Sequence, residues 1–346
     1  MSIIGYFSLM IDLRSDTVTK PTPAMLEAMM SAEVGDDVFG ADTTVNHLQN
    51  RLAEMFGMED ALYCPSGTMT NQIALRIASR PQDEVICDKR SHIYLYEGGG
   101  MAYNSMLSPK LLDGDSGRIT AEMVAANINA LDDIHLPRTS IVGLENTMNK
   151  GGGCIYDINE IRAIRKVCDE NGLHLHLDGA RLFNALVETG ESPSEYGELF
   201  DTISICFSKG LGAPVGSVLL GTSDHIREAK RVRKVLGGGM RQVGYLAAAC
   251  NYALDHHIDR LKEDHARARV LGEEMAKKDF VEQVLPVETN IVISELVNIT
   301  PKQLLAKFEQ LGLFAVAFGP QAVRFVTHLD FDDQQLDQAV DLIRRL

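Results

Sequence analysis

Lys209 stands where an apolar strand pattern gives way to a turn, a position from which an amine can do chemistry. It follows the apolar residues Thr202 to Phe207 and precedes a glycine-rich stretch that begins at Gly210. A lysine at such a sheet edge is partly desolvated, which favours the neutral, nucleophilic amine that Schiff-base formation with a carbonyl compound requires. The plainer alternative is a lysine whose alkyl stem lies along the strand end while its ammonium group stays in water.

Asp178 ends the segment HLHLD at residues 174–178, which alternates like a strand. The alternation places His174, His176 and Asp178 on one face and the two leucines on the other. Three interpretations are open at this point. Asp178 could cap a turn beside two packed histidines, or the three side chains could bind a metal in a metal-dependent hydrolase. In the third interpretation, Asp178 pairs with a protonated pyridine nitrogen and strengthens the ring as an electron sink.

The segment PSGT at residues 65–68 lies between a short strand pattern and a helix pattern. The free N–H groups of a helix's first turn and the helix dipole suit a phosphate dianion. Gly67 permits a close approach of the backbone, and the Thr68 hydroxyl adds a donor. An ordinary turn with a helix N-cap explains the same residues.

Other polar side chains could take part in binding or proton transfer. His92 follows the strand pattern around Cys87, with Glu97 close behind, and could stack on a planar ring or move protons near neutral pH. Arg324 lies in the middle of an apolar strand pattern, so it needs a counter-charge, and its planar fork suits a carboxylate. A lone histidine such as His92 or His135 is more often a surface residue, and Arg324 could instead form an internal salt bridge.

The elements that must position these groups alternate between strand and helix patterns, which predicts an α/β fold with a mostly parallel sheet covered on both faces. Apolar runs predict strands at residues 61–64, 84–87, 139–144, 173–177, 202–207 and 218–220. The pattern is helical almost without a break over residues 241–278. It then predicts a strand (281–294), a helix (301–310), a hairpin around Gly319 and Pro320, a strand (322–327) and a helix (332–345).

This organisation predicts an N-terminal extension over residues 1–10, a large domain over residues 11–260 and a small C-terminal domain over residues 261–346. A chain of 346 residues can bury the cores of both domains. Its formal net charge of -15 argues against a nucleic acid or an anionic membrane surface as a partner. The six cysteines show no CxxC pair, which predicts reduced thiols in a cytoplasmic protein. No apolar run approaches the roughly 20 residues of a transmembrane helix.

Short segments from residue 11 to the C-terminus match the motifs of one protein family. They are residues 12–19 (DLRSDTVT), 35–40 (GDDVFG), 65–69 (PSGTM), 91–93 (SHI), 144–147 (LENT), 177–181 (LDGAR), 207–212 (FSKGLG) and 237–242 (GGGMRQ). With these motifs the chain closely resembles the low-specificity L-threonine aldolases, enzymes that use pyridoxal 5′-phosphate (PLP) and have the fold type I of aspartate aminotransferase. The resemblance implies a mostly parallel seven-stranded sheet in the large domain and a small α/β C-terminal domain.

The resemblance also implies roles for individual residues. Lys209 would carry PLP as a Schiff base, Asp178 would pair with the pyridinium nitrogen, and His92 would stack on the ring. The remaining implied contacts are Ser66, Gly67, Thr68 and Arg181 to the cofactor, Lys234 and Arg241 to the cofactor of a neighbouring subunit, and Ser15, Arg181 and Arg324 to the substrate. Glu97 and His135 match further catalytic positions. The implied assembly is a homo-oligomer, a tetramer built from catalytic dimers.

The implied reaction cleaves L-threonine, L-allo-threonine and related β-hydroxy-α-amino acids to glycine and an aldehyde. Our hypothesis is that His92 is the base that takes the β-hydroxyl proton. Another PLP-dependent lyase or an aminotransferase of the same fold type could use the same cofactor residues, and a non-catalytic PLP carrier is a further alternative. The metal-dependent hydrolase also stays open. Met148 stands where many relatives have histidine, a departure that bears on the preference for the β-substituent and on stereochemistry.

Overall fold

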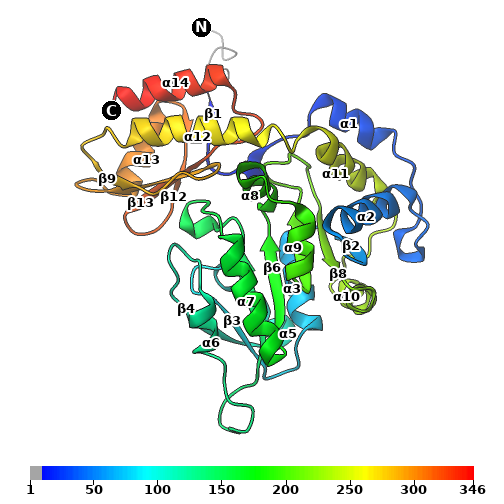
Figure 1. The fold of residues 1–346 in the computed structure, drawn as a ribbon. Coiled ribbons are helices and arrows are strands. Elements are labelled where there is room, and N and C mark those ends of the chain that lie inside the picture. The colour runs from blue at the N-terminus through cyan, green and yellow to red at the C-terminus, as the bar shows by residue number, and fades with distance from the viewer. Residues whose placement is uncertain (1–9) are drawn as a thin grey trace.

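The computed structural model describes residues 10–346, which form a large sheet packed between helices and a smaller C-terminal unit (Figure 1). Apart from Met10, the predicted N-terminal extension lies outside the described residues. The helices are α1 (Pro23–Met30), α2 (Thr43–Phe56), α3 (Gly67–Ile77), α4 (His92–Leu95), α5 (Gly100–Ser105), α6 (Ala121–Ala125), α7 (Ile158–Asn171), α8 (Leu182–Thr189), α9 (Pro193–Leu199), α10 (Ser223–Val235), α11 (Gly244–His256), α12 (Leu261–Met275), α13 (Pro301–Gln310) and α14 (Asp333–Arg344). The strands are β1 (Ile11–Asp12), β2 (Asp60–Cys64), β3 (Glu84–Asp88), β4 (Ser108–Leu112), β5 (Thr139–Glu145), β6 (His174–Gly179), β7 (Thr202–Cys206), β8 (Ser217–Gly221), β9 (Val281–Val284), β10 (Ile291–Leu296), β11 (Leu313–Phe314), β12 (Val316–Ala317) and β13 (Ala322–Val326).

The large sheet has seven strands in the order β2-β8-β7-β6-β5-β3-β4. Every pairing in it is parallel except the two that β8 makes with β2 and β7. The predicted mostly parallel sheet is therefore confirmed. Because β2, β3, β5, β6 and β7 run in the same direction, their carboxyl ends meet at one edge of the sheet, where ligands of open α/β folds bind.

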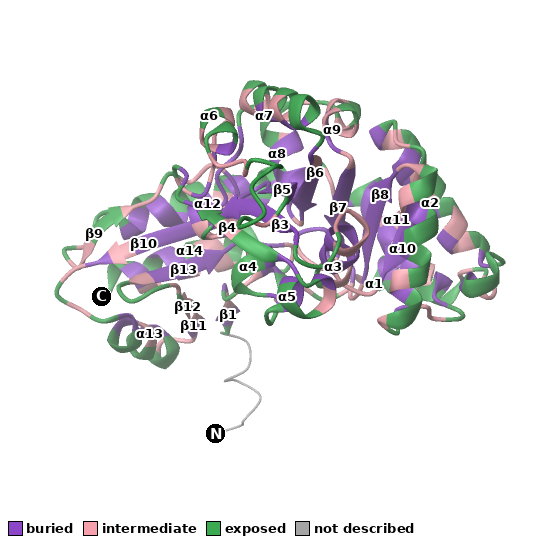
Figure 2. Ribbon diagram, turned by 90° about the horizontal axis from the view of Figure 1, so that it is seen from below, coloured by how far each residue is buried: buried purple, intermediate pink, exposed green. Residues whose placement is uncertain are grey.

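The two faces of the large sheet differ in chemistry. Leu175 and Leu177 point into the main core, which α2, α7, α8, α9 and α11 cover. The opposite face of the same strand carries His176 and Asp178 and packs against α3, whose Asn71 contacts both side chains. The predicted alternation of residues 174–178 is thus confirmed, and both faces are buried (Figure 2).

The predicted strands of the large sheet are confirmed, with ends shifted by one or two residues, but two predictions further along are wrong. The single strand predicted over residues 281–294 is an antiparallel pair, β9 and β10, because Pro286 lies in the segment between them. The long helix predicted over residues 241–278 is α11 followed by α12. A turn over residues 257–260 separates the two helices, and there His257 Nδ1 donates to the Leu211 carbonyl at 2.7 Å.

The smaller unit has its own core beneath the antiparallel sheet β12-β13-β10-β9. The hairpin around Gly319 and Pro320 joins β12 to β13, as predicted. Strand β1 belongs to this unit in space, because it pairs with β11, and Ile11 and Leu13 are buried in the same core. The N-terminal segment therefore crosses from the C-terminal unit to the large sheet, while the domain boundary near residue 260 stays a prediction.

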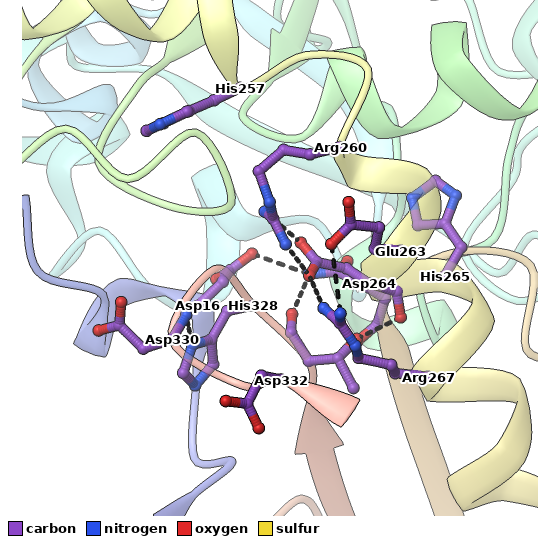
Figure 3. Close-up of polar contacts among 12 residues, drawn as sticks. Asp16, His257, Arg260, Glu263, Asp264, His265, Arg267, His328, Asp330 and Asp332 are labelled. Atoms are coloured by element: carbon purple, nitrogen blue, oxygen red, sulfur yellow. Dashed lines mark hydrogen bonds and ion pairs between the residues drawn. The ribbon is translucent and has the colours of Figure 1, made fainter. Parts of the chain in front are cut away.

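The start of α12 is joined to the end of β13 by buried polar contacts, and the end of β13 is joined to the N-terminal segment (Figure 3). Arg260 pairs with the fully buried Asp264 at 2.6 Å. The Thr327 hydroxyl donates to the Asp264 backbone carbonyl at 2.7 Å, and His328 Nε2 lies 2.6 Å from the Asp12 carbonyl. Burial raises the pKa of Asp264 despite the charge of Arg260. These bonds fix the end of β13 and the N-terminal segment relative to α12.

Two further observations bear on the environment of the chain. All six cysteines are free and buried, which agrees with the predicted reduced thiols. Among residues 10–346, no helix combines the length and the apolar character that crossing a bilayer demands.

Replacing Leu13 by alanine tests the role of the N-terminal segment in the second core. Leu13 is fully buried, so Leu13→Ala should lower the free energy of unfolding by about 2–5 kcal/mol through lost burial and the cavity left behind. Met10→Ala is the control, since Met10 is 51% exposed and its loss should cost less than about 0.5 kcal/mol. Urea unfolding curves measure both values, and equal curves for the two variants would contradict the packing described.

Candidate active site

A cavity of about 360 Å³ opens between the carboxyl edge of the large sheet and the smaller unit. The side chains that line it come from both units, so the site depends on their packing together. They are Ser15, Thr17, His92, Tyr96, Asn149, Arg181, Lys209, Val316, Ala317, Phe318 and Arg324. Five residues that the sequence predicted to bind cofactor or substrate or to act in catalysis, Ser15, His92, Arg181, Lys209 and Arg324, therefore meet in one cavity.

Lys209 lies in the turn between β7 and β8, and its backbone is held from two sides. Its carbonyl accepts hydrogen bonds from Gly212 N at 2.8 Å and from the Thr19 hydroxyl at 3.2 Å. Gly212 has a φ of +76°, a left-handed conformation that glycine adopts without strain, so the turn closes directly behind the lysine. The side chain of Lys209 thus extends from a fixed turn into the cavity.

Asp178 is a buried carboxylate with no lysine or arginine partner within ion-pair distance among residues 10–346. Its Oδ2 accepts from Asn71 Nδ2 at 2.8 Å, and its Oδ1 accepts from Ala180 N at 3.1 Å. The Nδ1 atom of His92 lies 4.0 Å from Oδ2. A buried carboxylate without a full counter-charge suits a protonated ring nitrogen, so the residues present fit a pyridine cofactor.

The two histidines of the HLHLD strand lie behind Asp178. His176 uses both ring nitrogens, Nδ1 with the Thr202 hydroxyl at 2.9 Å and Nε2 with Asn71 Oδ1 at 3.1 Å. Burial lowers the pKa of His176 to about 4 and that of His174 to about 3, so both rings are neutral. Because both ring nitrogens are in hydrogen bonds, His176 has no nitrogen left to bind a metal. Its bond to Asn71 instead orients that residue towards Asp178.

His92 begins α4 and lies between the cavity and a cluster of buried acids. Its Nδ1 atom is 3.0 Å from Glu97 Oε1, and its ring lies 5.6 Å from that of Tyr96. Burial alone would lower the pKa of His92, but the Glu97 hydrogen bond and the charges of Asp178 and Glu145 outweigh it and raise the pKa. Among the described residues, His92, Glu97 and Asp178 are also the group whose ligand atoms come close enough to share a cation.

The predicted phosphate turn lies at the start of α3, at the same sheet edge as Lys209. Ser66 is the N-cap, and its Oγ accepts from Met69 N at 3.2 Å. Gly67 is the first residue of the helix and lies close to Cys206 at the end of β7. The first-turn N–H groups near Gly67 and Thr68 are therefore available to a phosphate, and the Thr68 side chain is exposed.

Arg181 is buried beside Lys209 and forms a two-pronged ion pair with Asp16. Its Nε donates to Asp16 Oδ2 at 2.8 Å and its Nη2 donates to Oδ1 at 2.7 Å. Asn290 adds a third donor to Asp16 at 3.2 Å. Complete burial would raise the pKa of Asp16, but the charge and hydrogen bonds of Arg181, together with Lys209, lower it far below its usual range. The Asp16 carboxylate is therefore ionised and fixes the Arg181 guanidinium.

Arg324 lines the cavity and has hydrogen-bond partners but no acidic partner among the described residues. Its Nη1 donates to Asn149 Oδ1 at 2.9 Å and its Nη2 donates to the Arg14 carbonyl at 3.0 Å, but Nε has no acceptor. No carboxylate among residues 10–346 lies within ion-pair distance, so the alternative of an internal salt bridge is wrong for the described chain. Burial and the charge of Arg181 lower the pKa of Arg324 to about 10. The Phe318 ring, 4.5 Å away, packs against the guanidinium.

Three predicted site residues do not reach this cavity within one chain. His135 lies on the exposed loop between α6 and β5, where its backbone N–H donates to Asp133. Lys234 lines a separate cavity beside α10, and Arg241 pairs with Asp36 at 3.0 Å. Within one chain, all three side chains therefore lie outside the cavity.

Met148, the departure from the family pattern, points away from the cavity. Its side chain is fully buried against Gly117, where an added Cβ would come within 2.5 Å of Met148 Cε. Within one chain, the methionine therefore fills the interior and does not line the site.

The structure adds polar residues to which the sequence assigned no role. Asn71 bridges Glu97 and Asp178, Asp16 fixes Arg181, and Asn149 fixes Arg324. Two sequence features could have drawn attention to these residues: Asn71 is a polar residue on the sheet-facing side of a helix, and Asp16 is an acid within the DLRSDTVT motif. Neither feature identifies a partner, because each partner comes from a distant part of the chain.

Comparison with known proteins agrees with this geometry. The model of the beta-eliminating lyase family matches residues 12–298. The low specificity L-threonine aldolase of Escherichia coli O157:H7 is 43% identical over 94% of this chain and 96% of its own length. The chain belongs to the low-specificity L-threonine aldolase family. The low-specificity L-threonine aldolase 1 of Arabidopsis thaliana is 38% identical over 92% of this chain and 91% of its own.

The fold agrees with solved structures of the same kind. The threonine aldolase of Leishmania major superimposes with a TM-score of 0.82 over 97% of this chain and 99% of its own, at 22% identity. This similarity establishes the PLP-enzyme fold type I that the motifs of the family implied.

Replacing Asp16 by asparagine tests the buried pair that positions Arg181. Asp16→Asn leaves a buried guanidinium without its counter-charge, so it should lower the free energy of unfolding by about 3–5 kcal/mol. Asp12→Asn is the control because its pair with Arg14 is largely exposed and should contribute less than about 1 kcal/mol. Urea unfolding at neutral pH measures both. A loss of stability for Asp16→Asn no larger than that of the control would contradict the role of the pair.

Proposed function

We propose that this chain is a PLP-dependent aldolase that cleaves L-threonine, L-allo-threonine and related β-hydroxy-α-amino acids to glycine and an aldehyde. The observation that carries the proposal is a cavity lined by Lys209 and by Arg324, which has no carboxylate partner in the described part of the chain, with the buried Asp178 carboxylate beside the cavity residue His92. The membership in a family of threonine aldolases supports the choice of aldol cleavage among the reactions open to this fold.

The residues that would hold PLP lie along the sheet edge. Lys209 would bind its aldehyde carbon, Asp178 its ring nitrogen, and Ser66, Gly67 and Thr68 its phosphate, with Arg181 beside the ring. When bound, PLP supplies an electron sink for the electrons of the bond that breaks at the substrate Cα. Asp178 would hold the proton on the ring nitrogen, and Asn71 keeps the Asp178 carboxylate in place for this role.

Arg324 and Ser15 would orient the substrate by its carboxylate. The free Nε of Arg324 and the buried position of its guanidinium make it a receptor for a planar anion. Fixing the carboxylate at one end fixes the rotation about Cα, which selects the Cα–Cβ bond for cleavage. Ser15 lines the same cavity, where its Oγ accepts from Thr17 N at 3.2 Å and donates to Asp16 Oδ1 at 3.5 Å. Its hydroxyl hydrogen would turn from Asp16 to the substrate carboxylate.

His92 would take the proton of the β-hydroxyl group. Its Nδ1–H donates to Glu97 Oε1, which leaves the lone pair of Nε2 as the basic site. A proton moves from the β-hydroxyl oxygen to Nε2, directly or through a water, as the Cα–Cβ bond breaks and the aldehyde forms.

Product analysis tests the proposed reaction. The holoenzyme given L-threonine should form equal amounts of glycine and acetaldehyde, and His92→Asn should lower kcat by about 10²–10⁴-fold because the base is lost. A matched control is His256→Asn, since His256 is exposed on α11 outside the cavity. Pyruvate with ammonia, or amino-group transfer to an oxo acid, would show a different PLP reaction. Full turnover by His92→Asn would contradict the assignment of the base.

The chain would act as a homo-oligomer, a tetramer of catalytic dimers, in which neighbouring copies complete each site. Large apolar side chains are exposed near the predicted intersubunit residues Lys234 and Arg241: Phe39 is 81% exposed and Val235 is 86% exposed. Exposed side chains of this size favour a protein interface over solvent. Lys234 and Arg241 flank Val235 in the sequence, so burying this surface would bring both cations to a partner's site.

A mixing experiment tests the shared site. Lys209→Ala and Lys234→Ala should each be nearly inactive as homo-oligomers, because each lacks one residue of every site. Refolded or co-expressed together, they should regain up to about a quarter of wild-type activity, since a mixed dimer assembles one site with both lysines intact. Activity of the Lys234→Ala variant equal to wild type, or no recovery on mixing, would contradict sharing.

We also propose that the protein works in the cytoplasm. Its six cysteines are free and buried, as is usual for a reducing compartment. The net charge of -15 gives no support to a nucleic acid or an anionic membrane as a partner.

A further inference from the structure

Glu145 is a buried acid at the carboxyl end of β5 that has no role in the reaction described so far. It is paired in register with Asp178 on the neighbouring strand β6, and only 5% of its surface is exposed. A buried carboxylate is costly unless hydrogen bonds compensate it. Its partners therefore indicate what the residue does.

Both oxygens of Glu145 accept hydrogen bonds from backbone N–H groups of the site. Oε2 accepts from His92 N at 2.7 Å, and Oε1 accepts from Asn149 N at 2.9 Å. The side chain of Ser91, which precedes α4, makes no capping bond, so Glu145 is the acceptor that satisfies the first N–H of α4. One carboxylate thus holds the backbone of two segments that come from different parts of the chain.

These two segments carry the two groups that act on the substrate. His92 is the proposed base, and the Asn149 side chain accepts from Arg324 Nη1 at 2.9 Å. Glu145 is therefore connected to the base through one hydrogen bond and to the carboxylate receptor through two. The positions of both groups therefore depend on Glu145.

We propose that Glu145 is a positioning residue that couples the base His92 to the carboxylate receptor Arg324 through its hydrogen bonds to His92 and Asn149. The inference rests on the proposed function, because it uses the roles given there to His92 and Arg324. Glu145 does not line the cavity, so it acts through the residues that it holds.

The surroundings of Glu145 make this coupling depend on pH. Burial and the charge of Asp178 raise the pKa of Glu145 to about 7, against the lowering effect of its two backbone hydrogen bonds and of His92. The titratable and charged groups that face it are Asp178, His92, Arg181, Cys87, Cys154 and Tyr156. The ionised form accepts both N–H bonds fully and predominates above pH 7. As the pH falls through 7, protonation weakens one of these bonds.

Binding of glycine to the holoenzyme tests the coupling without any cleavage step. Glycine has the carboxylate that Arg324 would bind but no β-hydroxyl group. Its binding is measured by the change in visible absorbance of the bound cofactor. Glu145→Gln replaces one acceptor oxygen by an amide NH2 group. Its dissociation constant for glycine should rise about tenfold, the effect of one lost charge-assisted hydrogen bond. In the wild type this constant should rise as the pH falls from 8 to 6, and in Glu145→Gln it should change less.

A double-mutant cycle separates coupling from general damage. Asn149→Ala should weaken glycine binding to a similar extent. The double variant should bind glycine no more weakly than the single variant with the lower affinity, because both changes break the same chain of hydrogen bonds from Glu145 through Asn149 to Arg324. Glu160→Gln is the matched control, since Glu160 accepts from the backbone N–H of Ala121 at 2.6 Å outside the cavity. It should leave glycine binding unchanged.

Amide hydrogen exchange gives a second readout that needs neither substrate nor turnover. The N–H groups of His92 and Asn149 should exchange faster in Glu145→Gln than in the wild type, because each loses part of its acceptor. In Glu160→Gln only the Ala121 region should change. An unchanged glycine affinity, unchanged exchange at His92 and Asn149, or independent multiplying effects of Glu145→Gln and Asn149→Ala would overturn the inference. If the wild type fails to cleave threonine, the proposed function fails, but these binding and exchange results stand separately.

Discussion

Taking a charge out of water costs several kcal/mol unless a partner of opposite sign compensates it. At the cavity between the sheet edge and the smaller unit lie two buried charges, Asp178 behind His92 and Arg324 in the lining, that have no lysine, arginine or carboxylate partner among residues 10–346. Asp178 has only the ring of His92 at 4.0 Å, and Arg324 has an amide and a carbonyl but no carboxylate. A protonated ring nitrogen of a cofactor would compensate the charge of Asp178, and a substrate carboxylate would compensate that of Arg324. The charges of the folded chain therefore suit both ligands.

The fold keeps these two charges in place through neutral partners. Asn71, itself held by His176, bonds Asp178, and Asn149 bonds Arg324. Neutral amides orient a charge without neutralising it, which leaves the charge free to act on a ligand. Arg181 is the contrast, because Asp16 neutralises it with two short bonds. The cavity therefore combines one compensated arginine with one that is free to bind an anion.

The sequence predicts much of this arrangement because parallel strands bring their carboxyl ends together. Asp178 and Lys209 follow clear apolar runs, so their shared edge could be predicted from alternation alone. The edge strand β4 was not predicted, since SPKLL has a proline and mostly exposed residues and lacks the pattern of a buried strand. Glu145, Asn71 and Asn149 could not be assigned, because their roles depend on contacts between segments far apart in the chain.

The central claim is that Lys209 holds the cofactor in this cavity. The most direct measurement is borohydride reduction of the purified holoenzyme, followed by digestion and mass spectrometry of the lysine-containing peptides. One modified peptide is expected, with the mass of the reduced cofactor on Lys209, and no such modification is expected in the Lys209→Ala variant. A cofactor found on another lysine, such as Lys150 or Lys234, or no modified peptide from a protein that binds the cofactor, would contradict it.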